Sequence, residues 1–296
     1  MSRTAFVNGR YQILSRARVH IEDRGYQFAD GVYDVCEVRG GVPIDEDRHL
    51  ARLRRSLGEL AIRPPMADAP LRLVLREVIR RNRIDDGLLY LQVTRGVAPR
   101  GHAFPSPPVA PSLVVTARRL DPMVRARATA GIAVITVPET RWARVDIKTI
   151  SLLPNVLAKQ AAKDAGAGEA WFVGKDGLVS EGASSNAWIV TAEGALVTAP
   201  TTAAILRGVT REAVFDTAAE LGLRFEERQF SVAEARGARE AFITAATALV
   251  TPVIRLDGQP VGSGQPGPTV LALRAALIAH TTPRSPAGVA RRSALR

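Results

Sequence analysis

The sequence predicts an α+β fold with two domains. Predicted strands and helices are intermixed along the 296 residues, without the regular strand–helix–strand repeat of a doubly wound sheet. The segment "LDPMVRARATAG" at residues 120–131 is typical of a connector, and the chain is long enough for a core on each side of it. We therefore expect a small N-terminal α/β domain at residues 1–121, a larger domain at residues 122–281 and a disordered basic tail at residues 282–296.

The first part begins with two predicted hairpins, which turn at an Asn-Gly pair (residues 8–9) and a Gly-Gly pair (residues 40–41). Two helices follow, the first capped by Asp45 and the second opened by Pro70, and then two strands. The proline-rich segment "VAPRGHAFPSPPVA" between those strands is predicted to be a loop. These helices and strands are expected near residues 45–60, 70–81, 87–96 and 111–120.

The second part continues with alternating short strands and helices. Strands are predicted at residues 132–137, 169–173 and 186–191. Helices are predicted at residues 154–165, from Gly208 or Thr210 to Gly222, and at residues 268–280.

The composition is that of a soluble globular protein, which we expect to be cytoplasmic. No apolar run reaches membrane-spanning length, and "MSRTAFVNGRYQIL" lacks the apolar region of a signal peptide. Cys36 is the single cysteine, so an internal disulfide and a cysteine-cluster metal site are excluded. The four histidines show no metal-ligand spacing, and we expect no metal.

The formal net charge of +11 leaves nucleic-acid binding as a remote alternative. Zinc-finger spacing and an aromatic RNA-binding signature are both missing from the sequence, and part of the excess charge lies in the basic tail. Most other arginines alternate with acids and leucines, as on a solvated helix face. Small anionic substrates explain the charge about as well as a polyanion does.

Lysine is rare in this chain, standing at only four of its 40 Lys and Arg positions. Arginine stays protonated in proteins, so only lysine can act as a nucleophile or form a Schiff base. Lys148 is flanked by apolar residues that would partly desolvate its amine, a setting suited to nucleophilic chemistry. The alternative is a structural pair with Asp146. The other three lysines are expected to be exposed: Lys159, Lys163 and Lys175.

Two further segments could form a ligand site. "VSEGASSN" places an acid, a glycine and hydroxyls before a predicted strand, although without further context its Gly-Ala-Ser-Ser part is better interpreted as a simple turn. "LRGVTRE" opens a helix whose free amides would suit a phosphate, although most helix starts bind nothing. Neither a P-loop nor a GxGxxG fingerprint is present in the sequence.

Five segments, in this order, together resemble the class IV pyridoxal-phosphate aminotransferases of fold type IV, and specifically the D-amino acid aminotransferases. They are "EDRGYQFADGVYDV", "YLQVTRGVAPRGHAFP", "RWARVDIKTISLLPNVLAKQ", "VSEGASSN" and "LRGVTRE", within a likeness that covers residues 4–280. The resemblance implies that the larger domain is a cofactor-binding pseudo-barrel. It also implies that Lys148 is the Schiff-base lysine, that Glu181 bonds the pyridine nitrogen and that Leu206 packs on the ring.

The resemblance also implies how the cofactor phosphate is held. Arg52 would make the charged contact, while Val209 and Thr210 would supply helix N-terminal amides and a hydroxyl. The family commonly has further hydroxyl residues in the segment matching "TAATALVTP". Here alanines stand at such places, and Thr247 is the expected substitute, so we expect a change in cofactor affinity. The alanines are Ala245, Ala246 and Ala248.

The substrate carboxylate would be bound by three residues. Tyr33 stands beside the cofactor, while Arg100 and His102 lie in the proline-rich loop, which in the family reaches in from the partner subunit. The resemblance thus implies a homodimeric D-amino acid transaminase with ping-pong transfer between D-alanine or D-glutamate and pyruvate or 2-oxoglutarate. The alternatives on the same scaffold are a branched-chain L-amino acid aminotransferase, an (R)-amine transaminase and an aminodeoxychorismate lyase.

Overall fold

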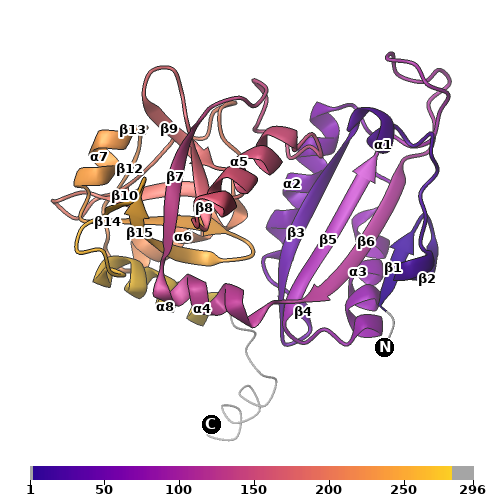
Figure 1. Cartoon of the computed structure of the whole chain (residues 1–296). Coiled ribbons are helices and arrows are strands. Elements are labelled where there is room, and N and C mark those ends of the chain that lie inside the picture. The colour runs from indigo at the N-terminus through magenta and orange to yellow at the C-terminus, as the bar shows by residue number, and fades with distance from the viewer. Residues whose placement is uncertain (1–2, 282–296) are drawn as a thin grey trace, which may run out of the picture.

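A computed structural model describes residues 3–281, which form two β-sheets with helices packed against them (Figure 1). The first sheet is built from residues 4–119 and the second from residues 132–260. Mixed strands and helices in two such groups confirm the predicted α+β fold. The predicted basic tail at residues 282–296 lies outside the described residues, and the division into domains at residue 122 stays a prediction.

The first sheet has the order β2-β1-β6-β5-β3-β4, with every neighbouring pair antiparallel. Both predicted hairpins are present in it, as β1–β2 and β3–β4. The strands are β1 (Thr4–Val7), β2 (Arg10–Ile13), β3 (Gly31–Arg39), β4 (Val42–Pro43), β5 (Gly87–Thr94) and β6 (Ser112–Arg119).

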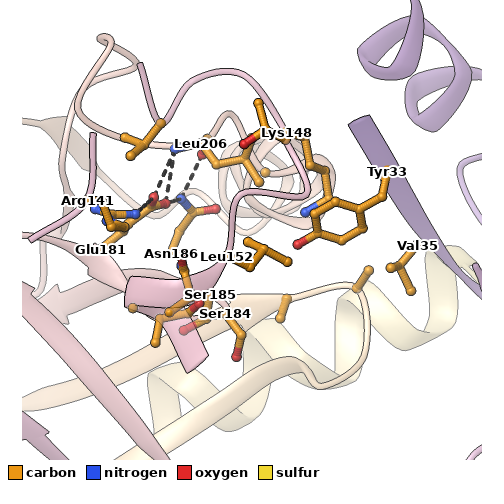
Figure 2. Close-up of a pocket in the computed structure, with 18 of the residues that line it drawn as sticks. Tyr33, Val35, Arg141, Lys148, Leu152, Glu181, Ser184, Ser185, Asn186 and Leu206 are labelled. Carbon is orange, nitrogen blue, oxygen red and sulfur yellow. Dashed lines mark hydrogen bonds and ion pairs between the residues drawn. The ribbon is translucent and has the colours of Figure 1, made fainter. Parts of the chain in front are cut away.

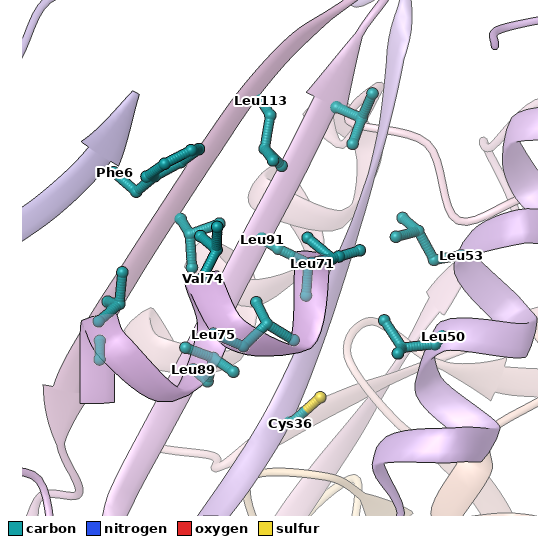
Figure 3. Close-up of a cluster of buried hydrophobic side chains, with 14 of the residues drawn as sticks. Phe6, Cys36, Leu50, Leu53, Leu71, Val74, Leu75, Leu89, Leu91 and Leu113 are labelled. Carbon is teal, nitrogen blue, oxygen red and sulfur yellow. The ribbon is translucent and has the colours of Figure 1, made fainter. Parts of the chain in front are cut away.

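Two amphipathic helices, α2 (Glu46–Glu59) and α3 (Asp68–Asn82), cover this sheet. Leucines of both helices pack on the leucines of β5, and the resulting core excludes water around Cys36 (Figure 3). Burial of these side chains is the main force that holds the helices on the sheet. The central residues are Leu50, Leu53, Leu71, Leu75, Leu89 and Leu91.

The starts of these two helices differ from prediction. Asp45 adopts a left-handed conformation with φ of 51° and makes no capping hydrogen bond through its side chain. Glu46 and Asp47 stand in the first turn instead, where their charges favour the positive end of the helix dipole. The second helix begins at Asp68, before Pro70, which lies in its first turn, where a missing N–H costs nothing.

The second sheet is larger and mixed, and it curls into part of a barrel. Its order is β12-β11-β10-β14-β15-β7-β8-β9-β13, with β16 paired to β15. The pairs β7–β8, β7–β15 and β11–β12 are parallel. Its strands are β7 (Ile132–Pro138), β8 (Glu169–Val173), β9 (Leu178–Gly182), β10 (Asn186–Val190), β11 (Leu196–Thr198), β12 (Phe225–Glu227), β13 (Phe230–Ser231), β14 (Glu240–Ala245), β15 (Leu249–Leu256) and β16 (Gln259–Pro260).

The helices of this half largely follow the prediction. They are α5 (Leu153–Asp164), α6 (Val209–Glu220), α7 (Val232–Gly237) and α8 (Pro268–Thr281). The expected connector is itself a helix, α4 (Pro122–Ala130), which packs on β15. Within residues 3–281, no helix is long and apolar enough to cross a membrane.

Helix α1 and strand β9 are among the short elements that were not predicted. Helix α1 (Arg24–Phe28) is capped by Asp23, whose side chain accepts a hydrogen bond from the Gly25 amide. Strand β9 contains Glu181, and the Ala183–Ser185 part of the Gly-Ala-Ser-Ser segment predicted as a turn follows it as a bend. Both elements depend on partners far along the chain: Asp23 also accepts from Thr94, and β9 pairs with β8 and β13.

The two halves meet along the first strand residues of β3. The segment that carries Lys148 lies beside this strand: the Tyr33 amide donates to the Lys148 carbonyl at 3.0 Å, and Val32 forms a β-bridge with Thr149. The Ile150 amide donates to the Gly31 carbonyl at 3.1 Å. A residue of the second half is thereby tied by backbone bonds to the sheet of the first.

Candidate active site

A cavity of about 530 Å³ lies where the two halves meet (Figure 2). Its walls come from β3, α2, the Lys148 segment, β9, the start of α6 and the segment after β14. Eight of the ten predicted site residues line it: Tyr33, Arg52, Lys148, Glu181, Leu206, Val209, Thr210 and Thr247. Residues that are up to 214 positions apart in the sequence therefore share one cavity.

Lys148 points into the cavity, and its Nζ lies 4.3 Å from the centre of the Tyr33 ring. Its backbone is fixed on both sides, since its carbonyl accepts from Tyr33 and its amide donates to Ser56 Oγ at 3.3 Å. The alternative prediction, a pair with Asp146, is wrong. The Asp146 carboxylate instead binds two arginines, Arg55 and Arg144. The lysine amine therefore faces the cavity beside an aromatic ring.

Glu181 is buried on the opposite side of the cavity from Tyr33 (Figure 2). Its carboxylate accepts hydrogen bonds from the Arg141 guanidinium, from Asn186 Nδ2 at 3.0 Å and from the Leu206 amide at 3.1 Å. Burial nevertheless raises the pKa of Glu181 to about 7, because removal from water outweighs the opposing effect of Arg141 and the amide. The charge of Lys148 in the cavity also lowers this pKa, but by less than burial raises it.

Arg141 is a site residue that sequence reasoning missed, although its segment "RWARVDIK" was singled out. Its guanidinium is buried, stacks at 4.3 Å over the Phe172 ring and also binds Glu139 through Nε at 2.9 Å. The pKa of Glu139 is lowered: burial alone would raise it, but Arg141 outweighs that effect. The only signal in the sequence was an arginine seven positions before Lys148, and its partner Glu181 is 40 positions away.

The start of α6 forms another wall of the cavity. Gly208 precedes the helix and no side chain caps it, so its first amides, near Val209 and Thr210, are available to an anion. The space around Gly208 leaves no room for a side chain, since a Cβ built on this residue would lie 2.1 Å from Asn186 Oδ1. Asn186 also donates to the Leu206 carbonyl at 2.9 Å, which fixes the segment that leads into the helix.

Arg52 faces this wall from α2 and is held by a network that the sequence did not reveal. Asp34, fully buried on β3, accepts from Arg52 Nε at 2.9 Å and from Nη2 at 2.7 Å. The same carboxylate pairs with His49 Nδ1 at 2.7 Å. Burial alone would raise the pKa of Asp34, but Arg52 and His49 hold it well below its usual range. Arg52 is therefore oriented by a buried acid.

The alanine-rich segment after β14 lies at the cavity as expected. Ala245, Ala246 and Thr247 all line it, whereas Ala248 does not. Thr244 also lines it, but its Oγ1 already accepts a hydrogen bond from Trp188 Nε1 at 3.0 Å. Thr247 is exposed there, so its hydroxyl remains accessible.

The two remaining predicted residues, Arg100 and His102, do not line this cavity. Both are exposed on the loop between β5 and β6, which projects beyond the edge of the first sheet (Figure 1). Arg100 lies over the Phe28 ring at 4.7 Å, and the His102 ring centre is 5.5 Å from the same ring. Within one chain, the structure does not bring this pair to Lys148.

Comparison with known proteins identifies the family. Residues 31–256 match the model of amino-transferase class IV. The chain is 42% identical over 270 residues to a D-alanine aminotransferase of Bacillus licheniformis, covering 91% of this chain and 94% of the relative. It is 37% identical over 280 residues to a D-alanine aminotransferase of Staphylococcus haemolyticus, covering 95% and 98%.

Solved structures agree. A branched-chain amino acid aminotransferase of T.th. with pyridoxamine 5'-phosphate superposes with a TM-score of 0.87 at 25% identity, over 97% of this chain and 96% of that one. A hypothetical aminotransferase of Mycobacterium tuberculosis in a PLP-bound form gives a TM-score of 0.82 at 25% identity, over 94% and 98%. With a cavity that joins a lysine, a buried glutamate and an uncapped helix start, this chain belongs to the class IV aminotransferases.

Proposed function

We propose that this protein is a pyridoxal-phosphate-dependent D-amino acid transaminase, which moves an amino group between D-amino acids and 2-oxo acids. The observation that carries the proposal is the placement of Lys148, Glu181 and the start of α6 around one cavity. The identity to proteins named D-alanine aminotransferase supports the choice of the D series and of D-alanine as a substrate. D-glutamate, pyruvate and 2-oxoglutarate are the further substrates we expect.

The cavity residues fit pyridoxal phosphate in charge and position. Lys148 would hold the aldehyde carbon, and Glu181 would face the pyridine nitrogen. A cationic ring nitrogen would favour the ionised form of a carboxyl whose pKa burial raises. The free amides of α6 and the Arg52 guanidinium would hold the phosphate, with Thr247 as a further hydroxyl donor.

When bound, the cofactor supplies an electron sink for the pair of electrons released at the substrate Cα. The chain has three tasks around it. Lys148 accepts the proton from the substrate Cα and returns it, because its amine can exchange protons where a guanidinium cannot. Glu181 keeps the ring nitrogen protonated, and Arg141, Asn186 and the Leu206 amide keep Glu181 in place.

Binding of the substrate carboxylate is assigned to Tyr33 together with Arg100 and His102 of a second copy of the chain. Two groups of exposed apolar side chains support the pairing of copies. One surrounds the projecting loop and includes Tyr26, 78% exposed, and Phe104, 60% exposed. The other lies at the cavity, where Trp142 lines the wall and Leu153 follows it on α5. Such surfaces are typical of subunit interfaces.

A spectral screen tests the proposal. The protein is loaded with pyridoxal phosphate, and its visible absorbance is followed after addition of D-alanine, L-alanine, D-glutamate, L-leucine or (R)-1-phenylethylamine. We expect bleaching with D-alanine and D-glutamate, recovery with pyruvate and no change with L-alanine. Bleaching by L-leucine or the amine alone would replace the D-specific assignment by one of the other class IV activities.

A further inference from the structure

The loop of residues 97–110, which carries Arg100 and His102, is attached at its base to the segment around α1. The Arg24 amide donates to the Gly96 carbonyl at 2.9 Å, and the Ala98 amide donates to the Glu22 carbonyl at 3.3 Å. Asp23 and Val97 form a β-bridge between these two bonds. The first residues of the loop are therefore held by a backbone ladder.

The side chain of Arg24 extends this attachment further into the loop. Its guanidinium is almost fully buried, with 4% of the side chain exposed. Nε donates to Asp30 at 2.8 Å, Nη1 donates to the Gly101 carbonyl at 2.6 Å and Nη2 donates to the His102 carbonyl at 3.3 Å. One buried cation thus links a carboxylate to the two backbone carbonyls that follow Arg100.

A second arginine shares the same carboxylate. Arg95 donates to Asp30 through Nε at 2.7 Å and through Nη2 at 3.0 Å. Its guanidinium lies only 3.5 Å from the centre of the Phe104 ring, a residue of the same loop. The two arginines lower the pKa of Asp30, although burial alone would raise it. Asp30 is therefore an anionic anchor between two points of the loop.

The ring of Phe28 completes the arrangement by contacting the two exposed side chains themselves. Arg24 lies 4.9 Å and Arg100 lies 4.7 Å from its centre, so the ring contacts two guanidinium groups. His102 packs against it at 5.5 Å. The direction of Arg100 and His102 is thereby set from within their own chain.

We propose that Arg24 is a positioning residue for substrate recognition: it presents Arg100 and His102 in a fixed arrangement to the cavity of a second copy. The proposal rests on the proposed function, in which these two residues bind the substrate carboxylate. A loop ordered in advance spares the substrate the entropy cost of ordering it, so the effect appears in substrate binding. Arg24 itself does not touch substrate or cofactor.

The test compares Arg24→Gln, Arg24→Lys and Phe28→Leu in the protein loaded with pyridoxal phosphate. Arg39→Gln is the matched control, because Arg39 is also a buried arginine, in an ion pair with Glu37 at 2.9 Å. It is the last residue of β3, whereas Asp30, the partner of Arg24, directly precedes the first. Each variant is assayed for kcat and KM with D-alanine, for its visible absorbance and for deuterium uptake by residues 97–110. The Arg24→Gln change is repeated in an Arg100→Gln background.

We expect Arg24→Gln to raise the KM for D-alanine about tenfold or more, since small displacements of binding groups are costly. Its absorbance should stay normal and its loop should exchange faster. The KM of Arg24→Lys should lie between those of the wild type and Arg24→Gln, because one ammonium group cannot donate to all three acceptors that the guanidinium reaches. In the Arg100→Gln background the same change should raise KM clearly less, because only His102 is then left to be displaced. Arg39→Gln should leave both KM and loop exchange unchanged.

Each other outcome is decisive. A normal KM for Arg24→Gln, or an equal increase in the Arg100→Gln background, overturns the positioning role while leaving the proposed function intact. A normal KM for Arg100→Gln alone refutes the carboxylate assignment, and with it the role of Arg24. If Arg24→Gln does not fold, Phe28→Leu carries the test, because it removes the ring that orients both side chains.

Discussion

The raised pKa of Glu181 makes the free energy of unfolding of the cofactor-free protein depend on pH. The substitution Glu181→Gln should remove this dependence. Burial raises this pKa from a usual value of 4.5 to about 7. A pKa that is higher in the folded state contributes stability at low pH, and this contribution is lost as pH rises through the folded pKa. At about 1.4 kcal/mol per pKa unit, the loss between pH 4.5 and 7 is about 3 kcal/mol.

The assay is urea unfolding of cofactor-free wild type and Glu181→Gln at pH 5, 6, 7 and 8. Relative to the variant, the free energy of unfolding of the wild type should fall by about 2–3 kcal/mol between pH 5 and 8. Little of this loss should occur above pH 7.5. Glu139→Gln is the matched control. The pKa of Glu139 is lowered in the folded protein, so its carboxyl is ionised in both the folded and the unfolded state across this pH range. The difference in free energy of unfolding between wild type and Glu139→Gln should therefore not change with pH. A flat difference for Glu181→Gln as well would refute the argument.

Three further substitutions test other parts of the cavity. Lys148→Ala should lower the turnover of D-alanine at least about 100-fold, because no other group replaces its amine; retained activity would contradict the assignment. Asp34→Asn should cost about 3 kcal/mol in urea unfolding and weaken cofactor binding, since it leaves the Arg52 charge uncompensated. Gly208→Ala should raise the cofactor Kd about tenfold in an absorbance titration, because the added methyl displaces Asn186; an unchanged Kd would show that the structure around Gly208 relaxes at little cost.

Elements with a strong local signal were predictable. The two N-terminal hairpins follow from turn dipeptides between apolar runs, and α3, α5 and α8 follow from their starting prolines and their length. Elements whose stability depends on distant partners were missed. Strand β9 pairs with β8 and β13, and Asp23, which caps α1, also accepts a hydrogen bond from Thr94 of β5. A local sequence window contains neither partner.

The candidate site divides in the same way. Residue type and the resemblance of short segments predicted Lys148, Glu181 and the start of α6 as site residues, and all three line the cavity. Arg141, Asp34 and His49 were not found, because an arginine, an aspartate or a histidine acquires its role from the partner it meets after folding.

The sequence by itself predicted the type of chemistry, because the proposed role of Lys148 needs an amine and lysine stands at only four positions of this chain. It also determined the α+β class, through turn and helix signals that act over a few residues. The tertiary structure alone decided the raised pKa of Glu181, the orientation of Arg52 and the attachment of the Arg100 loop to Arg24. These are effects of burial and of contacts between residues far apart in the chain, so they arise only when the two sheets are brought together.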